Sequence, residues 1–160
     1  MPRIDFAFGA PDRLRTACLV ARKQYQAGRP LVVYCGDAKR LQAFDRLLWA
    51  FDDTTFIPHV RADDPLAVQT PVLLAATAPA RARDTLLADA QAGQPAPWLL
   101  NLDDDCPPDY DAFERVLEIV SADDEADRHA ARARWRSYQG AGHTPQSHAI
   151  GNAAPAGETP

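Results

Sequence analysis

Cysteine is scarce in this chain of 160 residues, and the few cysteines lack the spacing of a metal-binding or disulfide motif. Cys18, Cys35 and Cys106 lie far apart and form no C-x-x-C pair. This spacing argues against both a disulfide framework and a paired-cysteine zinc site. We therefore expect reduced thiols, as in a cytoplasmic protein.

Long apolar runs are also missing. No stretch approaches the roughly 18 consecutive apolar residues of a membrane-spanning helix. The opening MPRIDFAFGAPDR lacks the apolar core of a signal peptide. We expect a soluble, cytoplasmic protein with no membrane partner.

The glycine patterns that bind phosphate groups are absent as well. The turn after the first predicted strand is Gly9-Ala-Pro-Asp12 instead of G-x-G-x-x-G, and no G-x-x-x-x-G-K-[ST] occurs. Without glycines at that turn, the backbone cannot easily approach a pyrophosphate. The sequence therefore argues against a nucleotide cofactor.

Basic residues are fewer than acidic residues in this chain. The chain has 17 basic and 22 acidic residues, which gives a net charge of −5. Because nucleic-acid binding depends on neutralising phosphates with lysine and arginine, we expect contact with DNA to be indirect. An apolar fraction of 46% in 160 residues suits one globular domain.

Strand and helix patterns alternate along the chain. Strands are indicated at residues 3–8, 31–35, 72–76 and 98–102, and helices at 12–25, 38–51 and 80–91. This order predicts a single-domain, Rossmann-like α/β fold. Its sheet would be parallel or mixed, with helices on both faces.

Two further helices are predicted near the C-terminal end, at residues 110–120 and from Ser121 to Gln139. Ser121-Ala-Asp-Asp124 resembles a helix start with an acidic residue three places on. From Thr144 the sequence is rich in proline, glycine and small residues, which predicts a disordered tail. The predicted organisation is a domain at 1–143 and a tail at 144–160.

Asp103-Asp104-Asp105 is the strongest catalytic candidate. It follows a predicted strand, where α/β sheets often place ligands, and three carboxylates can hold a magnesium ion. Aspartates also suit a solvated turn before Pro107. Cys35 has no histidine base beside it, and the histidines lack metal-ligand spacing. We expect no catalytic residue, cofactor or metal; the alternative is a small nucleotide-binding or metal-dependent enzyme using Asp103–Asp105.

Trp49 stands opposite the apolar face of its predicted helix. Leu41, Phe44 and Leu48 share that face, and Trp49 projects roughly 140° from its centre. Phe56 in the following loop is a candidate neighbour. Two interpretations are open: another element of the domain covers both rings, or they anchor a partner protein, since tryptophan is enriched at binding hot spots.

The last predicted helix carries the sequence RHAARARWRSYQ. Arg128, Arg132 and Trp135 lie at i, i+4 and i+7 and therefore form one stripe. Two guanidinium groups beside an aromatic ring suit a peptide that carries a carboxylate and an apolar side chain. They would also suit a phosphate, and a solvated basic helix end is the plainer interpretation.

Together these segments resemble the DNA polymerase III chi subunit family over residues 3–143. The resemblance rests on G-R-P-L-V-V-Y-C, on L-x-x-F-D-R-L-L-W-A followed by F-I-P-H, and on R-x-x-x-R-x-R-W-R-S-Y-x-x-A-G. The arginine-rich stretch at 80–96 and the chain after His143 depart from the family pattern. The resemblance implies a non-catalytic accessory subunit of the DNA polymerase III holoenzyme that acts in DNA replication at the replisome.

The resemblance also implies two docking faces. Family members pair with the psi subunit, which tethers them to the clamp loader, and bind the acidic, phenylalanine-ending C-terminal tail of single-stranded-DNA-binding protein. By position, Trp49 and Phe56 fall on the psi-binding face, for which a repair helicase is an alternative partner. The tail-binding residues would be Arg128, Arg132 and Trp135, with Val120 and Arg134 as weaker candidates.

Overall fold

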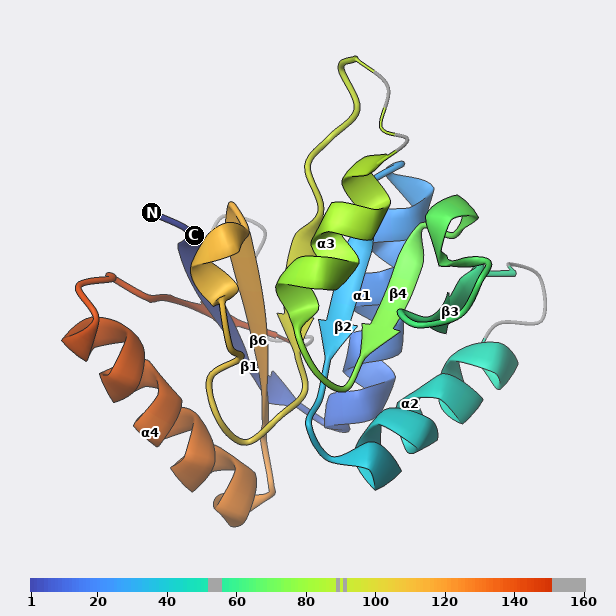
Figure 1. Ribbon diagram of the computed structural model, residues 1–160. Helices are drawn as coiled ribbons and strands as arrows, with labels where there is room; N and C mark the ends of the chain where they lie inside the picture. Colours follow the sequence, from blue (N-terminus) through green and yellow to red (C-terminus); the bar gives the residue numbers. More distant parts are fainter. Residues whose placement is uncertain (52–55, 89, 91, 151–160) are drawn as a thin grey trace.

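Strands and helices alternate along the chain in the computed structural model, which describes residues 1–51, 56–88, 90 and 92–150 (Figure 1). The strands are β1 (Arg3–Ala10), β2 (Leu31–Tyr34), β3 (His59–Arg61), β4 (Val72–Ala75), β5 (Trp98–Asn101), β6 (Arg115–Ser121) and β7 (Gln146–Ala149). The helices are α1 (Arg13–Gln26), α2 (Ala38–Ala50), α3 (Pro79–Ala88) and α4 (Glu125–Gly140), with 3-10 helices η1 (Ala67–Gln69) and η2 (Tyr110–Ala112).

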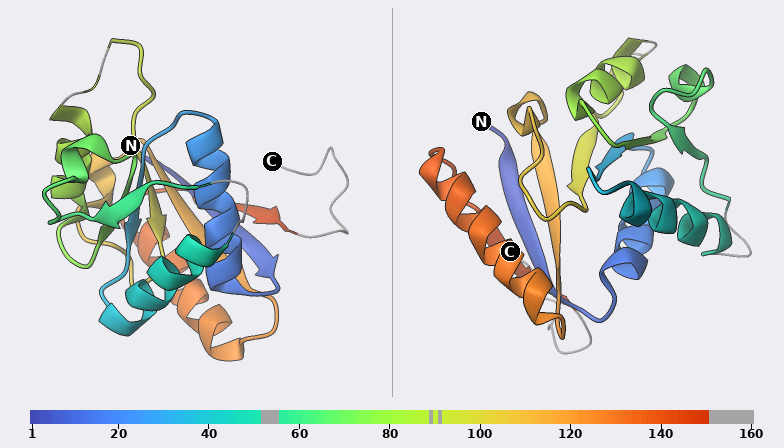
Figure 2. Two further views of the ribbon diagram at one scale, coloured as in Figure 1. Left: turned by 90° about the vertical axis from the view of Figure 1, so that its right-hand side faces the viewer. Right: turned by 60° about the horizontal axis from the view of Figure 1, so that its bottom comes forward.

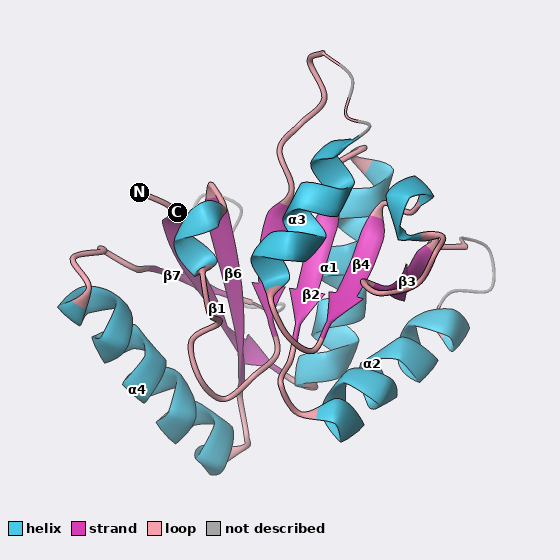
Figure 3. Ribbon diagram, in the orientation of Figure 1, coloured by secondary structure: helices cyan, strands magenta, loops and turns pink. Residues whose placement is uncertain are grey.

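The described strands form one seven-stranded sheet in the order β3-β4-β2-β5-β6-β1-β7, and their pairings are all parallel. Parallel neighbours need crossover connections, most of which contain a helix here. Helices α1 and α2 pack on one face, and α3 and α4 on the other (Figures 2 and 3). The predicted Rossmann-like fold with helices on both faces is confirmed, and the sheet is parallel throughout its described strands.

The central strands are buried on both sides, which explains their unbroken apolar sequences. In β2, Val33 packs toward α1 and α2, whereas Val32 packs toward the α3 and α4 side. Both valines have no exposed surface. Full burial of such a side chain stabilises the fold by about 1.5–3 kcal/mol.

Local capping fixes where α1 begins and ends. The Asp12 side chain accepts a hydrogen bond from the Arg15 amide at 3.2 Å and so satisfies one of the free amides of the first turn. Gly28 follows the helix with φ of +73°, a left-handed conformation that favours glycine. The helix therefore stops in time for the chain to enter β2.

The segment 110–120 was predicted as a helix, and this prediction is wrong: it forms η2 and strand β6. Its apolar residues recur at helical spacing, but in the strand they divide between the two faces of the sheet. Leu117 and Ile119 pack on the α1 side, while Val116 and Val120 pack on the α4 side. A strand buried on both faces lacks the polar alternation that would have revealed it.

The tail predicted to begin at Thr144 needs correction for its first residues. Residues Gln146–Ala149 form β7, which pairs with β1 through Asp5–Phe8. Three of the four β7 residues are exposed, so the sequence carried no apolar pattern there. Residues 151–160 of the expected tail lie outside the described residues.

Two smaller boundaries also differ from the prediction. Helix α4 begins at Glu125 instead of Ser121, because the Asp124 side chain accepts from the Asp127 amide and caps the helix there. Strand β3 was not predicted, since it contains three residues only. Of the predicted helix at 80–91, the structure describes α3 as ending at Ala88, while residues 89 and 91 lie outside the described part.

Candidate partner-binding surfaces

A buried ion pair fixes α4 against the sheet. Arg134 Nε donates to Glu118 Oε1 of β6 at 2.9 Å, and these side chains are 1% and 0% exposed. The other oxygen of Glu118 accepts from the Tyr138 hydroxyl at 2.7 Å and from Asn101 Nδ2 at 2.9 Å. Burial, together with the Glu118 charge, raises the pKa of Tyr138. With Arg134 held inside, α4 has a defined rotation about its axis.

That rotation presents the predicted arginine stripe beside an apolar groove. The groove has a volume of about 340 Å³ and lies between α4 and strands β1, β6 and β7. We call it the α4 groove. Its apolar lining includes Phe6, Phe8, Val120 and Trp135, and its basic lining includes Arg128 and Arg132.

The two kinds of lining residue differ in exposure. Trp135 packs against Phe6 with ring centroids 5.0 Å apart, and Val120 is 8% exposed. By contrast, the side chains of Arg128 and Arg132 are 49% and 50% exposed. The groove therefore offers an apolar floor with the cationic groups of Arg128 and Arg132 at its border, and the exposed Arg136 also lines it.

The structure brings together four of the five residues predicted for this face. Arg128, Arg132, Trp135 and Val120 line the groove. Arg134 does not: it is 2% exposed and already paired with Glu118, so it is a core residue and cannot lie on a docking surface in this conformation.

Sequence reasoning missed the contribution of β1 to this groove. Phe6 and Phe8 lie on the α4 side of the sheet, and Phe8 is 42% exposed. Phe8 is in register with Val120 on β6. The two phenylalanines alternate with polar or small residues, which was a usable signal. Linking them to α4 required knowing that β6 lies beside β1.

A second surface surrounds Trp49 at the end of α2. Leu41, Phe44 and Leu48 of this helix are buried, whereas Trp49 is 56% exposed. Phe56 is 61% exposed, and the two ring centroids lie 5.3 Å apart. We call Trp49 and Phe56 the Trp49 patch. No element of the described chain covers it fully, so the outward orientation predicted for Trp49 is confirmed.

His59 supports this patch from beneath and was not predicted to do so. Its ring lies 4.6 Å from the Trp49 ring, and its side chain is 1% exposed. Nδ1 donates to the Ile57 carbonyl oxygen at 2.7 Å, and Nε2 lies 3.0 Å from Asp45 Oδ1 of α2. These contacts join β3 to α2 and hold the indole in place.

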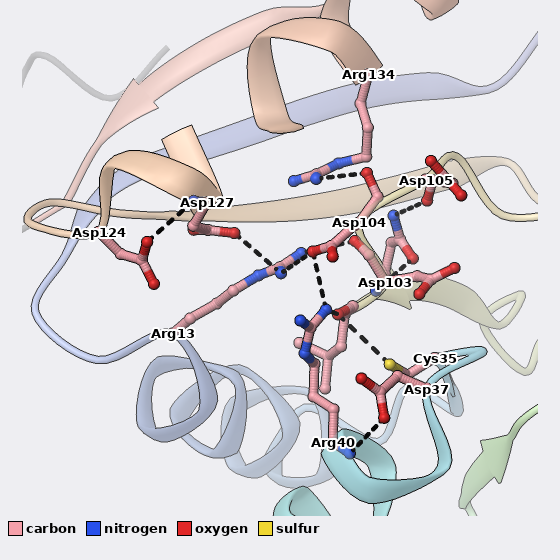
Figure 4. A network of polar contacts seen from close by, with 12 residues as sticks. Arg13, Cys35, Asp37, Arg40, Asp103, Asp104, Asp105, Asp124, Asp127 and Arg134 are labelled. Carbon is pink, nitrogen blue, oxygen red and sulfur yellow. Dashed lines mark hydrogen bonds and ion pairs between the residues drawn. The ribbon is translucent and has the colours of Figure 1, made fainter. Parts of the chain in front are cut away.

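The carboxylates considered for metal binding lie in a loop tied down by arginines (Figure 4). Arg13 of α1 donates to the Asp103 carbonyl at 3.1 Å, and Arg134 of α4 donates to the Asp104 carbonyl at 3.0 Å. Arg40 of α2 donates to Asp104 Oδ1, also at 3.0 Å. The loop thus cross-links three helices. In the ranges that the structure describes, no group of three potential metal ligands comes together.

Cys35 is equally engaged in packing. Its side chain is fully buried at the end of β2, where Sγ donates to the Leu102 carbonyl at 3.5 Å. Burial raises the pKa of this thiol. Since the thiolate is the nucleophilic form, the surroundings of Cys35 disfavour nucleophilic chemistry.

Comparison with known proteins identifies the family of this chain. A family model described as DNA polymerase III chi subunit, HolC, matches residues 1–146. The chain belongs to this chi subunit family. It is similar to DNA polymerase III subunit chi of Pseudomonas aeruginosa, with 30% identity over 154 residues that cover 94% of this chain and 98% of the relative.

Family membership assigns the chain to DNA replication as an accessory subunit of DNA polymerase III. The resemblance that the sequence motifs indicated is therefore confirmed. Each helix in the described ranges is too short or too polar to cross a membrane.

Proposed function

We propose that the chain is a non-catalytic adaptor with two partners. It would join the psi subunit of DNA polymerase III, and through it the clamp loader, to the C-terminal tail of single-stranded-DNA-binding protein. The observation that carries this proposal is the α4 groove, where two exposed guanidinium groups border an apolar floor. DNA would be reached through the partner, because the net charge of −5 disfavours broad DNA binding.

The expected tail matches the groove in chemistry. It is acidic and ends in phenylalanine, so it offers several carboxylates and one aromatic ring. Arg128 and Arg132 can receive the carboxylates in charge-assisted hydrogen bonds, for which the planar guanidinium is well suited. The terminal ring would pack against Trp135 on the apolar floor.

A contact of this size is weak on its own. A micromolar Kd, or about −8 kcal/mol, is the expected scale. The partner is oligomeric and lies in many copies along one strand, so several weak contacts together hold the complex more firmly than one. Weak individual contacts would also let the chain release one bound tail and bind another quickly as the replisome moves.

The Trp49 patch is the proposed site for the psi subunit. Two large rings, each more than half exposed, gain free energy when a partner removes them from water. His59 and Asp45 hold Trp49 in its outward position, which limits the entropy lost on binding. A repair helicase is the alternative occupant of this patch, and capture of bound proteins from a cell extract, identified by mass spectrometry, separates the two.

Titration of the tail peptide by calorimetry tests the proposal. Arg128→Ala and Arg132→Ala should each weaken binding at least about fivefold, because each removes a charge-assisted contact. Arg81→Ala is the matched control, since Arg81 is an exposed arginine on α3, away from the groove. Unchanged affinity in both groove variants would contradict the assignment of the tail to this groove.

An enzymatic role has its own test. A thermal shift of the protein with nucleotides and Mg²⁺ would support the alternative that uses Asp103–Asp105. We expect no shift, because the backbone and one carboxylate of this loop already bind Arg13, Arg40 and Arg134.

A further inference from the structure

Two of the groove arginines already share a carboxylate within the chain. Glu125 is the first residue of α4, and its Oε1 lies 2.9 Å from an Arg132 guanidinium nitrogen. Its other oxygen, Oε2, lies 3.7 Å from a guanidinium nitrogen of Arg128. One side chain therefore bridges two of the three arginines that line the α4 groove, while Arg136 is the third.

The helix itself creates this bridge. Arg128 follows Glu125 by three residues and Arg132 by seven, so all three lie on one side of α4. The Glu125 side chain is 72% exposed and is not fixed by packing. It can leave the arginines without disturbing the core, which a permanent structural contact such as Arg134 to Glu118 cannot do.

We infer that Glu125 is a built-in competitor for acidic ligands of the α4 groove. This inference rests on the proposed function, because it concerns the same site. In the free protein Glu125 occupies the guanidinium groups, and a ligand carboxylate must displace it or share them. Glu125 thereby weakens the binding of the acidic ligand and favours its dissociation. It does so without contacting the apolar floor of the groove.

The electrostatics of Glu125 agree with this role. The hydrogen bond from Arg132, and then the charges of Arg128 and Arg132, lower the pKa of Glu125 below its ordinary value. The carboxylate is therefore charged at neutral pH and competes continuously. An acidic residue in the first turn also suits the helix dipole, so a purely local role in stabilising α4 is the interpretation that an experiment must exclude.

A charge-matched pair of variants separates the two roles. Glu125→Gln removes the competing charge, and Asp123→Asn removes an exposed charge two residues earlier that contacts neither arginine. The probe is a nine-residue acidic peptide ending in phenylalanine, titrated at fixed ionic strength. We expect Glu125→Gln to bind about two- to fivefold more tightly, the range that an exposed ion pair supports, and Asp123→Asn to bind nearly as the wild type does.

The double variant Glu125→Gln/Arg132→Ala completes the test. In the Arg132→Ala background, Glu125 can compete with the peptide for Arg128 only. Glu125→Gln should therefore improve peptide affinity less in that background than in the wild type. If Arg132→Ala weakens binding while Glu125→Gln leaves it unchanged or weaker, the competitor role is overturned and the proposed function stands. If Arg132→Ala, Arg128→Ala and Glu125→Gln all leave affinity unchanged, both are overturned. Thermal unfolding of each variant confirms that α4 remains folded.

Discussion

His148 on β7 lies 2.6 Å from the carboxylate of Asp5 on β1, measured from Nε2 to Oδ1. Asp5 is 3% exposed, and its Oδ2 accepts from Arg115 Nε of β6 at 2.7 Å. One carboxylate therefore connects three neighbouring strands at the edge of the sheet. Strand β7, which the sequence did not predict, is thus held by side chains as well as by its backbone pairing with β1.

This connection predicts a specific dependence on pH. Burial acts to raise the pKa of Asp5, but the hydrogen bonds from His148 and Arg115 and the charges of Arg115 and Arg3 outweigh it, so the pKa lies below its ordinary value. A carboxyl with a lowered folded-state pKa stabilises the protein fully above its unfolded-state pKa. It loses that contribution as the pH falls through the folded-state pKa.

Asp5→Asn should therefore lower the free energy of unfolding at pH 7 by about 1.5–3 kcal/mol, the range for hydrogen bonds to charged groups. The difference from the wild type should shrink as the pH falls below about 4, where the unfolded wild-type carboxyl takes up a proton, and should vanish below the lowered folded-state pKa. Urea unfolding across this pH range measures both effects. Asp63→Asn, which changes an exposed aspartate, is the control. A difference that stays constant into acid would show that the Asp5 charge is not responsible.

We expect Arg134 to stabilise the fold through its buried ion pair with Glu118. Arg134→Leu leaves Glu118 buried without its cation, which should lower the free energy of unfolding by about 3–5 kcal/mol. Arg136→Leu, at an exposed position two residues on, should change it by less than about 0.5 kcal/mol. Denaturant unfolding of both variants provides the comparison, and equal stabilities would refute the structural role of Arg134.

We expect Trp49 to contribute to partner binding and little to the stability of the fold. Trp49→Ala should abolish co-purification of the psi subunit while the unfolding free energy falls by no more than about 1 kcal/mol, because the indole is 56% exposed. Leu87→Ala changes another exposed apolar residue, 40% exposed on α3, and should leave psi bound. A large loss of stability in Trp49→Ala would mean that the ring belongs to the core.

Ionic strength should distinguish the two partners. Raising salt from about 0.1 M to 1 M shortens the Debye length from about 10 Å to 3 Å, so binding of the acidic peptide should weaken by about tenfold. Binding of psi through aromatic rings should change much less. Peptide affinity that is insensitive to salt would speak against pairing with Arg128 and Arg132.

The sequence predicted the fold class because buried parallel strands leave continuous apolar runs, as in LVVY and VLLA. It failed at β6 because Glu118 interrupts the apolar run, and the apolar residues on either side recur at helical spacing. It failed at β7 because an exposed edge strand buries too little to leave a pattern.

The sequence predicted the groove residues that helical spacing brings together and missed those that tertiary contact brings there. Arg128, Arg132 and Trp135 follow from helical geometry alone. The same geometry could not show that Arg134, one residue before Trp135, points to a buried glutamate on β6. Likewise, His59 approaches Trp49 only because β3 lies beside the end of α2.

Strand order has a consequence for how two partners could be arranged. The Trp49 patch rests on His59 of β3, at one margin of the sheet, and the α4 groove includes Ser147 of β7, at the other. Six strand spacings of about 4.8 Å separate the two margins by roughly 29 Å. The two surfaces share no residue, so a segment bound at one would not have to leave before a segment binds at the other.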